Sequence, residues 1–130
     1  LTRPYVRNLS VHKCPSWKHA WTGKYNQSTH LSYAYCAYLA YYRTTTGELA
    51  PRPWNNVMRP TKVLLLADSP DVDLGYGRTY GYYQVWQKGE PAYPSTRHGD
   101  RASVCYVDGH VRALTQEQLE DPVLWRVLPE

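Results

Sequence analysis

The sequence contains no phenylalanine and one methionine, although 42% of its 130 residues are hydrophobic. Its aromatic residues are 13 Tyr and 5 Trp, whose hydroxyl and indole groups need hydrogen-bond partners when they are buried. This composition favours a half-buried sheet or an interaction surface over the dry core of a helical bundle.

Long hydrophobic runs are also missing. The longest strongly apolar run, from Val63 to Ala67, is far shorter than the roughly 20 residues that span a bilayer. No signal peptide is visible, and the chain begins at Leu1, so we expect a natural N-terminal segment to precede it. The length fits a single domain, residues 1–130, which can fold without a metal or a dense disulfide framework.

The net charge of +4 is modest and unevenly distributed. Residues 1–60 carry eight Lys and Arg against Glu48 alone, whereas residues 61–130 carry seven against ten acidic residues. Folding either mixes the two halves or leaves a basic and an acidic face that steer copies together head to tail. No nucleic-acid-binding module is recognisable, so nucleic acid is not an expected partner.

Three cysteines, an odd number, argue against a complete disulfide framework. Cys14 and Cys36 are the best candidates for one bridge, which would close a loop of about 23 residues and contribute roughly 3 kcal/mol. Cys105 lies in an apparent strand and is expected to be a buried thiol. Three thiols in a reducing compartment are the alternative.

Local patterns predict mainly strands and loops. Residues 62–68 are expected to form a strand buried on both faces, and residues 102–108 a second strand. Asp108-Gly109 predicts a tight two-residue hairpin turn after it. Residues 32–42 fit a strand or a helix, as do residues 80–88. Loops are expected at 43–61, 69–77 and 89–99.

The C-terminal tail carries the clearest helix signals. Thr115 and Gln118 have the spacing of a capping box. Asp121-Pro122 is a second helix start, with proline at the first helical position.

The segment from Arg97 to Val111 has the most specific pattern, in which His98 is followed by nine residues and then Asp108-Gly109. It resembles the H-x9-DG signature of a pilin-like family similar to type II secretion pseudopilins, which carry a prepilin-type processing segment. Two further blocks resemble the family in order. Residues 13–16 with Ser32-Tyr33 match its CPS…SY pattern, and residues 60–68 match its strand ending in Asp.

The resemblance implies an α+β fold: a pilin-like head with a central antiparallel β-sheet and a short C-terminal helix. A prepilin helix, absent from these residues, would anchor the precursor in the inner membrane and then pack in a filament core. The implied function is a non-catalytic structural subunit of a type II secretion or pilus-like apparatus. Its partners would be other pilin or pseudopilin subunits, and its location the periplasm, the cell surface or the exterior.

The motif residues His98, Asp108 and Gly109 all have local folding roles. Glycine suits a primed turn, aspartate tolerates the neighbouring position, and a histidine ring can bond a nearby carbonyl or carboxylate. No cofactor is required, although the resemblance implies a structural calcium ion as one hypothesis. Its candidate ligands are carboxylates, which otherwise are solvated turn residues: Asp68, Asp71, Asp73 and Asp108.

Other functions have weaker sequence support. His12, Cys14, His19 and His30 match no common zinc-module spacing. Cys105, His98, His110 and Asp108 include the residue types of a thiol hydrolase, but a thiol in an apolar strand is usually inert, so no enzyme is expected. The alternative function is a cell-surface carbohydrate-binding module whose aromatic face, interleaved with lysines, would comprise Trp17, Trp21 and Tyr25.

Overall fold

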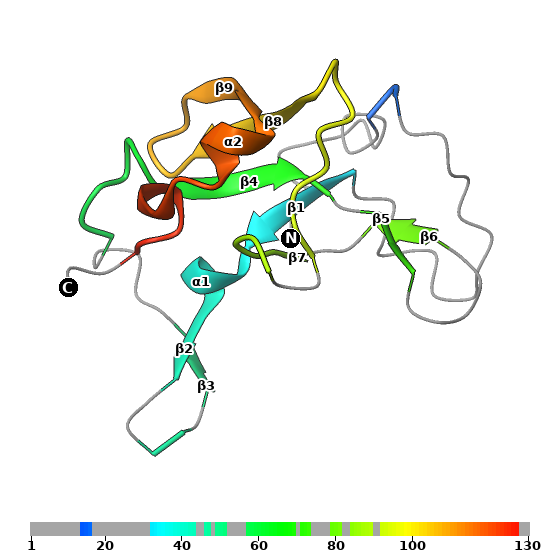
Figure 1. The fold of residues 1–130 in the computed structure, drawn as a ribbon. Coiled ribbons are helices and arrows are strands. Elements are labelled where there is room, and N and C mark those ends of the chain that lie inside the picture. Colours follow the sequence, from blue (N-terminus) through cyan, green and yellow to red (C-terminus); the bar gives the residue numbers. More distant parts are fainter. Residues whose placement is uncertain are drawn as a thin grey trace, which may run out of the picture.

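A mixed sheet of five strands is the largest element of the computed structural model (Figure 1). The structure describes residues 14–16, 32–43, 46–47, 49–51, 57–69, 71–73, 79–81, 84–89 and 92–127. Neighbouring strands are antiparallel except for β1 and β7, which are parallel. In spatial order the strands are β7 (Gln84–Val85), β1 (Tyr33–Cys36), β4 (Leu64–Asp68), β8 (Arg101–Tyr106) and β9 (Val111–Thr115).

Two small strand pairs accompany the main sheet. In Figure 1 the pair β2 and β3 projects away from it, and β5 and β6 lie beside it. Parts of these pairs fall where only loops were predicted, because a three-residue strand is too short to show a periodicity. Their bounds are β2 (Tyr41–Arg43), β3 (Leu49–Pro51), β5 (Asp71–Asp73) and β6 (Thr79–Gly81).

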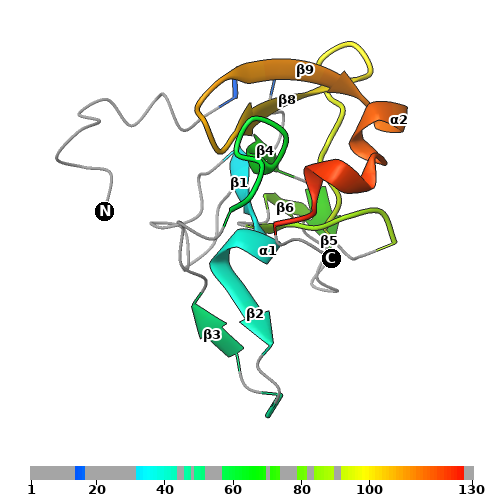
Figure 2. The same cartoon turned by 90° about the vertical axis from the view of Figure 1, so that its left-hand side faces the viewer.

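One face of the main sheet packs against the helical C-terminal tail. Along β8 the buried side chains alternate at Ala102, Val104 and Tyr106, as expected for a strand with one face in a core. The tail contributes α2 (Gln116–Leu119) and η3 (Pro122–Leu124), a 3₁₀ helix. Figure 2 shows both along one side of the sheet. The core cluster joins strand residues to tail residues, among them Leu119, Leu124, Trp125 and Val127.

The opposite face is partly open. The register places Leu66 opposite Cys105, and Cys105 opposite Val111, so these three side chains form a row on one face of β4, β8 and β9. Leu66 is 38% exposed and Val111 66% exposed. The strand predicted at 62–68 is therefore present as β4, but it is not buried on both faces.

The segment 32–42, which was predicted as either a strand or a helix, contains both. β1 is followed by the single-turn helix α1 (Ala37–Ala40) and then by β2. The alternation of Tyr33 and Tyr35 belongs to β1, while Tyr38 and Leu39 belong to α1. Neither period extends over the whole segment, so neither prediction alone was correct.

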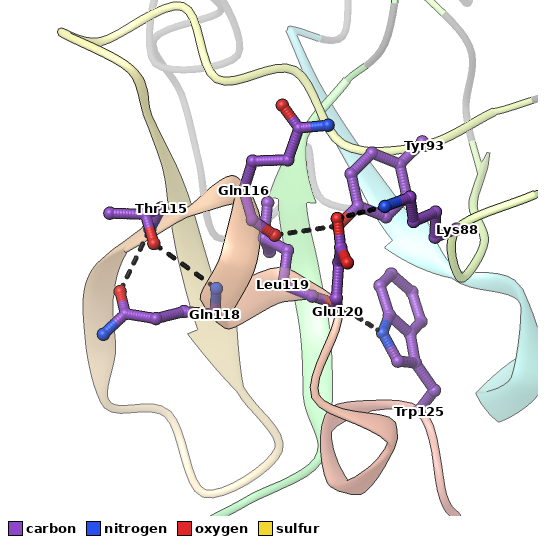
Figure 3. A network of polar contacts seen from close by, with 8 residues as sticks. All are labelled: Lys88, Tyr93, Thr115, Gln116, Gln118, Leu119, Glu120 and Trp125. Atoms are coloured by element: carbon purple, nitrogen blue, oxygen red, sulfur yellow. Dashed lines mark hydrogen bonds and ion pairs between the residues drawn. The ribbon is translucent and has the colours of Figure 1, made fainter.

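The tail is held by polar contacts around α2 (Figure 3). The predicted capping box is confirmed, since Thr115 and Gln118 exchange side-chain and backbone hydrogen bonds at 3.0 and 3.3 Å. The Trp125 indole N–H donates to the buried carbonyl of Leu119 at 2.9 Å. Burial, and then the negative charge of Glu120, raise the pKa of Tyr93 to about 12.

The β8–β9 hairpin exists, but its turn differs from the predicted one. The loop has three residues, Val107 to Gly109, because the Gly109 N–H donates to the Tyr106 carbonyl and the Tyr106 N–H donates to the His110 carbonyl. Gly109 has φ of +92°, whereas Asp108 does not have a positive φ. This is the three-residue hairpin in which glycine takes the left-handed position.

The expected α+β, pilin-like head is wrong. Helix in the described residues is limited to α1, α2 and η3, with four, four and three residues, and the sheet dominates. The parallel β1–β7 pair also makes the central sheet mixed rather than antiparallel. The helix-start signals in the tail are genuine, but Pro122 follows α2 so closely that no long helix can form. Within the described ranges, no helix has the length and hydrophobicity needed to cross a membrane.

Gly109→Ala should destabilise the protein by about 1–2 kcal/mol, because alanine resists a positive φ. No atom lies within 4 Å of the position that the added Cβ would occupy, so the cost is one of backbone conformation alone. Chemical denaturation measures it. Gly109→Asn is the matched control and should cost less, since asparagine tolerates this conformation. Equal losses in the two variants would contradict the explanation.

Trp125→Phe should cost about 1–3 kcal/mol, because it leaves the buried Leu119 carbonyl without its donor. Denaturant unfolding of the variant tests this. Lys88→Ala is the comparison: it removes the exposed Lys88–Glu120 ion pair, with its 2.5 Å separation, and should cost under about 1 kcal/mol. If Lys88→Ala lowered the free energy of unfolding more than Trp125→Phe, the buried hydrogen bond would not be the stronger of the two contacts.

Candidate functional site

Three segments that are distant in the sequence meet at the C-terminal end of β4. They contribute Cys14, Asp68 and His98, and one potential ligand atom from each of these residues lies within 4.8 Å of the other two. Asp68 is the last residue of β4, and His98 precedes β8. We call this group the Cys14–Asp68–His98 cluster. It is the strongest concentration of reactive side chains in the part of the chain that the structure describes.

Asp68 is the most deeply placed member. Its side chain has no solvent exposure. Oδ2 accepts a hydrogen bond from the backbone N–H of Ser103 at 2.5 Å, which ties β4 to β8. Oδ1 is buried and has no hydrogen-bond partner among the described residues. The Nε2 atom of the His98 ring lies 3.5 Å from Oδ1.

A tight turn positions His98. Gly99 and Asp100 both have φ of +59°, the condition for a primed two-residue turn. The His98 N–H donates to the carbonyl of Arg101 at 3.1 Å, which closes the turn at the start of β8. A primed turn was predicted at Asp108-Gly109, whereas the two consecutive left-handed residues are Gly99 and Asp100. The His98 side chain is 32% exposed, so one edge of the ring reaches solvent.

Cys14 is held to the sheet through Ser32. The Cys14 N–H donates to Ser32 Oγ at 2.7 Å, and the Ser69 N–H donates to the Ser32 carbonyl at 2.8 Å. Ser32 thereby connects the 14–16 segment to the residue that follows β4. Cys14 is only 3% exposed, and its Sγ lies 3.2 Å from His98 Nε2.

Tyr33 and Arg97 border the cluster. Burial, and then the proximity of Cys14 and Asp68, raise the pKa of Tyr33, while the neighbouring Arg97 acts in the opposite direction. The Arg97 guanidinium donates to the Ser69 carbonyl. These contacts place one phenol and one permanent cation beside the acidic members of the cluster.

The geometry differs from that of a nucleophile–base–acid relay. In such a relay the nucleophile and the carboxylate contact different nitrogens of the histidine ring. Here Cys14 Sγ and Asp68 Oδ1 both face Nε2. A single N–H cannot satisfy two acceptors fully. The arrangement instead directs a sulfur, a nitrogen and an oxygen toward one point, as ligands around a metal ion are directed.

The remaining motif residues lie at the other end of β8. Asp108 Oδ1 accepts two hydrogen bonds from His110. One comes from the backbone N–H at 3.2 Å and the other from the ring Nδ1 at 2.6 Å. Burial alone would raise the pKa of Asp108, but these bonds and the His110 charge lower it overall. The His110 ring stacks on Tyr106 with centroids 4.1 Å apart. His98 and Asp108 therefore do not share a site.

The candidate calcium ligands are divided in the same way. Asp68 lies in the cluster, and Asp108 lies in the turn beyond the opposite end of β8. Asp71 and Asp73 are the first and last residues of β5. The structure does not bring Asp68 and Asp108 to one ion. The candidate glycan face, Trp17, Trp21 and Tyr25, lies outside the described residues, as do His12, His19 and His30.

The cysteines do not form the Cys14–Cys36 disulfide that was the best candidate from the sequence. Cys14, Cys36 and Cys105 are all present as thiols, and Cys14 contacts His98 in place of the expected bridge to Cys36. Cys36 lies in the core with no solvent exposure. Cys105 is half-buried on the open face, and burial, followed by the charge of Asp108, raises its pKa. A raised pKa disfavours the thiolate that nucleophilic chemistry requires.

The sequence patterns do not indicate the cluster as a unit. Its members were assigned separately to a disulfide, a calcium site and a turn. The available signal was that each of the three blocks carrying the family resemblance contributes one member. Comparison with known protein families, curated proteins and solved structures finds no match to this chain.

Ser32→Ala should destabilise the protein by about 1–3 kcal/mol, because the buried Cys14 N–H loses its acceptor. Urea unfolding measures the change. Ser16→Ala is a matched control, because Ser16 is an exposed serine in the 14–16 segment that Ser32 holds. It should change stability by less than about 0.5 kcal/mol. Equal effects at the two serines would mean that Ser32 does not anchor the segment.

Proposed function

We propose that this protein is a non-catalytic structural subunit of a type II secretion or pilus-like apparatus, related in function to the pseudopilins. The proposal rests on the resemblance of its three sequence blocks and makes no use of the pilin-like head fold, which the structure overturns. Assembly would depend on an apolar helix in the complete protein, with the described sheet exposed at the cell surface or in the periplasm.

The observation that carries the proposal is the meeting of the three blocks at one place. Cys14 belongs to the CPS block, Asp68 ends the strand block, and His98 begins the H-x9-DG block. Their contacts fasten the 14–16 segment to the end of the central strand β4. A pull on the chain before Cys14 would be transmitted into the middle of the sheet. A subunit held in an assembly through its N-terminal segment requires such a connection.

The open face of the sheet gives further support. Leu66, Cys105 and Val111 form a row across three strands on this face. Asp68 is two residues from Leu66 along β4, so its side chain belongs to the same face. The cluster therefore holds the 14–16 segment at one end of the open face. The row of Leu66, Cys105 and Val111 is an apolar surface that a helix of the complete protein could cover.

The cluster does not have the features of a thiol hydrolase. Cys14 has 3% exposure, which leaves little of its sulfur accessible to a substrate. The contacts of Cys14 and Asp68 with the same ring nitrogen also lack the order of a proton relay.

The complete gene product, in the cells that produce it, tests the proposal. A tagged protein should appear in the sheared surface-filament fraction, and loss of the prepilin peptidase should leave it unprocessed in the inner membrane. Processing by the ordinary signal peptidase, with release as a monomer, would refute the proposal.

Leu66→Lys supplies a structural test of the same proposal. Because Leu66 is already 38% exposed, the variant should fold, but it should strongly reduce the amount of protein in the filament fraction. Met58→Lys is the matched control, since Met58 is an exposed apolar residue outside the sheet. Immunoblots of sheared and cell fractions compare the two. Normal assembly of Leu66→Lys would show that the open face is not used.

A further inference from the structure

We propose that the Cys14–Asp68–His98 cluster is a zinc site, in which Cys14 Sγ, Asp68 Oδ1 and His98 Nε2 are the three protein ligands. This inference does not depend on the proposed assembly function. It concerns an ion different from the calcium considered above, and only Asp68 is common to the two ligand sets.

Asp68 Oδ1 is the strongest indication of a ligand. The atom is buried, and no described residue donates a hydrogen bond to it. A buried carboxylate oxygen without a partner is costly, so folded proteins normally satisfy it by pairing or by a metal. His98 Nε2, at 3.5 Å, is too far for a good hydrogen bond and lies closer to Cys14 Sγ. One cation between the three atoms would bind Asp68 Oδ1 and Cys14 Sγ at the same time, so that neither has to share the His98 nitrogen.

The spacing of the atoms suits a tetrahedral ion. Zinc binds sulfur at about 2.3 Å and nitrogen or oxygen at about 2.0–2.2 Å, which places its ligand atoms about 3.5 Å from one another. The cluster has 3.2 Å between Sγ and Nε2, 3.5 Å between Nε2 and Oδ1, and no separation above 4.8 Å. Small side-chain movements would complete the geometry.

The donor set selects zinc over calcium. Calcium takes six to eight oxygen ligands, whereas zinc accepts thiolate, imidazole and carboxylate. A thiolate and a carboxylate together neutralise the double charge of the ion, which suits a site where Cys14 and Asp68 are buried. Three protein ligands leave a fourth position for water or another group, and the partly exposed edge of His98 lies toward solvent.

The scaffold already restricts each ligand. Asp68 is fixed through Ser103, Cys14 through Ser32, and His98 through the Gly99–Asp100 turn. Such supporting contacts orient ligands before the ion binds and reduce the entropy lost on binding. The ion would then join β4, the start of β8 and the 14–16 segment.

Cobalt titration of the chelator-treated, reduced protein tests the site. Co²⁺ should bind with one equivalent and give a thiolate-to-cobalt charge-transfer band together with the visible bands of a four-coordinate ion. Zinc should then displace it. Cys14→Ser and His98→Gln should abolish these bands. Cys105→Ser and His110→Gln are matched controls outside the cluster and should retain them. Binding without the thiolate band, or loss of the band in Cys105→Ser alone, would overturn the proposal.

Asp68→Asn separates a metal ligand from a purely structural carboxylate. The amide oxygen can still accept the Ser103 N–H, so the metal-free variant should be at least as stable as the metal-free parent protein. Its zinc affinity should fall about tenfold or more. Zinc at a hundredfold excess over its Kd should raise the parent Tm by roughly 5–10 °C and the variant Tm by much less. Equal shifts in the two proteins would remove Asp68 from the ligand set. Zinc that shifts neither Tm would refute the site, whether or not a variant folds poorly.

Discussion

A carboxylate with no solvent exposure must be compensated inside the protein, and the arrangement around Asp68 follows from this constraint. One of its oxygens accepts the backbone N–H of Ser103, which joins the central strand β4 to β8. The other faces His98 and is the atom for which the described residues provide no hydrogen bond. The loop before β8 and the 14–16 segment meet at this end of the strand, where Asp68 and Ser32 together connect distant parts of the chain.

The H-x9-DG pattern acquires a simple structural meaning. The nine residues between His98 and Asp108 comprise the two left-handed residues Gly99 and Asp100, the six residues of β8, and Val107. The spacing therefore measures one turn and one strand. It places the histidine in the buried cluster at one end of β8 and the Asp-Gly turn at the other. The motif residues therefore flank the two ends of the strand and do not form a single site.

Strong local signals predicted the central part of the fold well. The strands near 62–68 and 102–108, the hairpin between 106 and 110, and the capping box of α2 depend on residues close in the sequence, and the structure contains all of them. The α+β class failed because it came from the family resemblance and not from local signals, and the helices in the described residues have only three or four residues each. The type of hairpin turn failed because the Asp-Gly pair is compatible with loops of two or three residues, and the strand register selects between them.

The sequence by itself determined which residues carry chemistry and which local elements form, since side-chain type, alternation and capping act over a few residues. It also placed Cys14, Asp68 and His98 in three separate patterned blocks. Only the tertiary structure decided that these residues meet, that Asp108 lies elsewhere, and that Leu66 faces outward. The physical reason is that strand order and register, which bring residues 84 positions apart within 3.2 Å, result from packing the whole sheet at once.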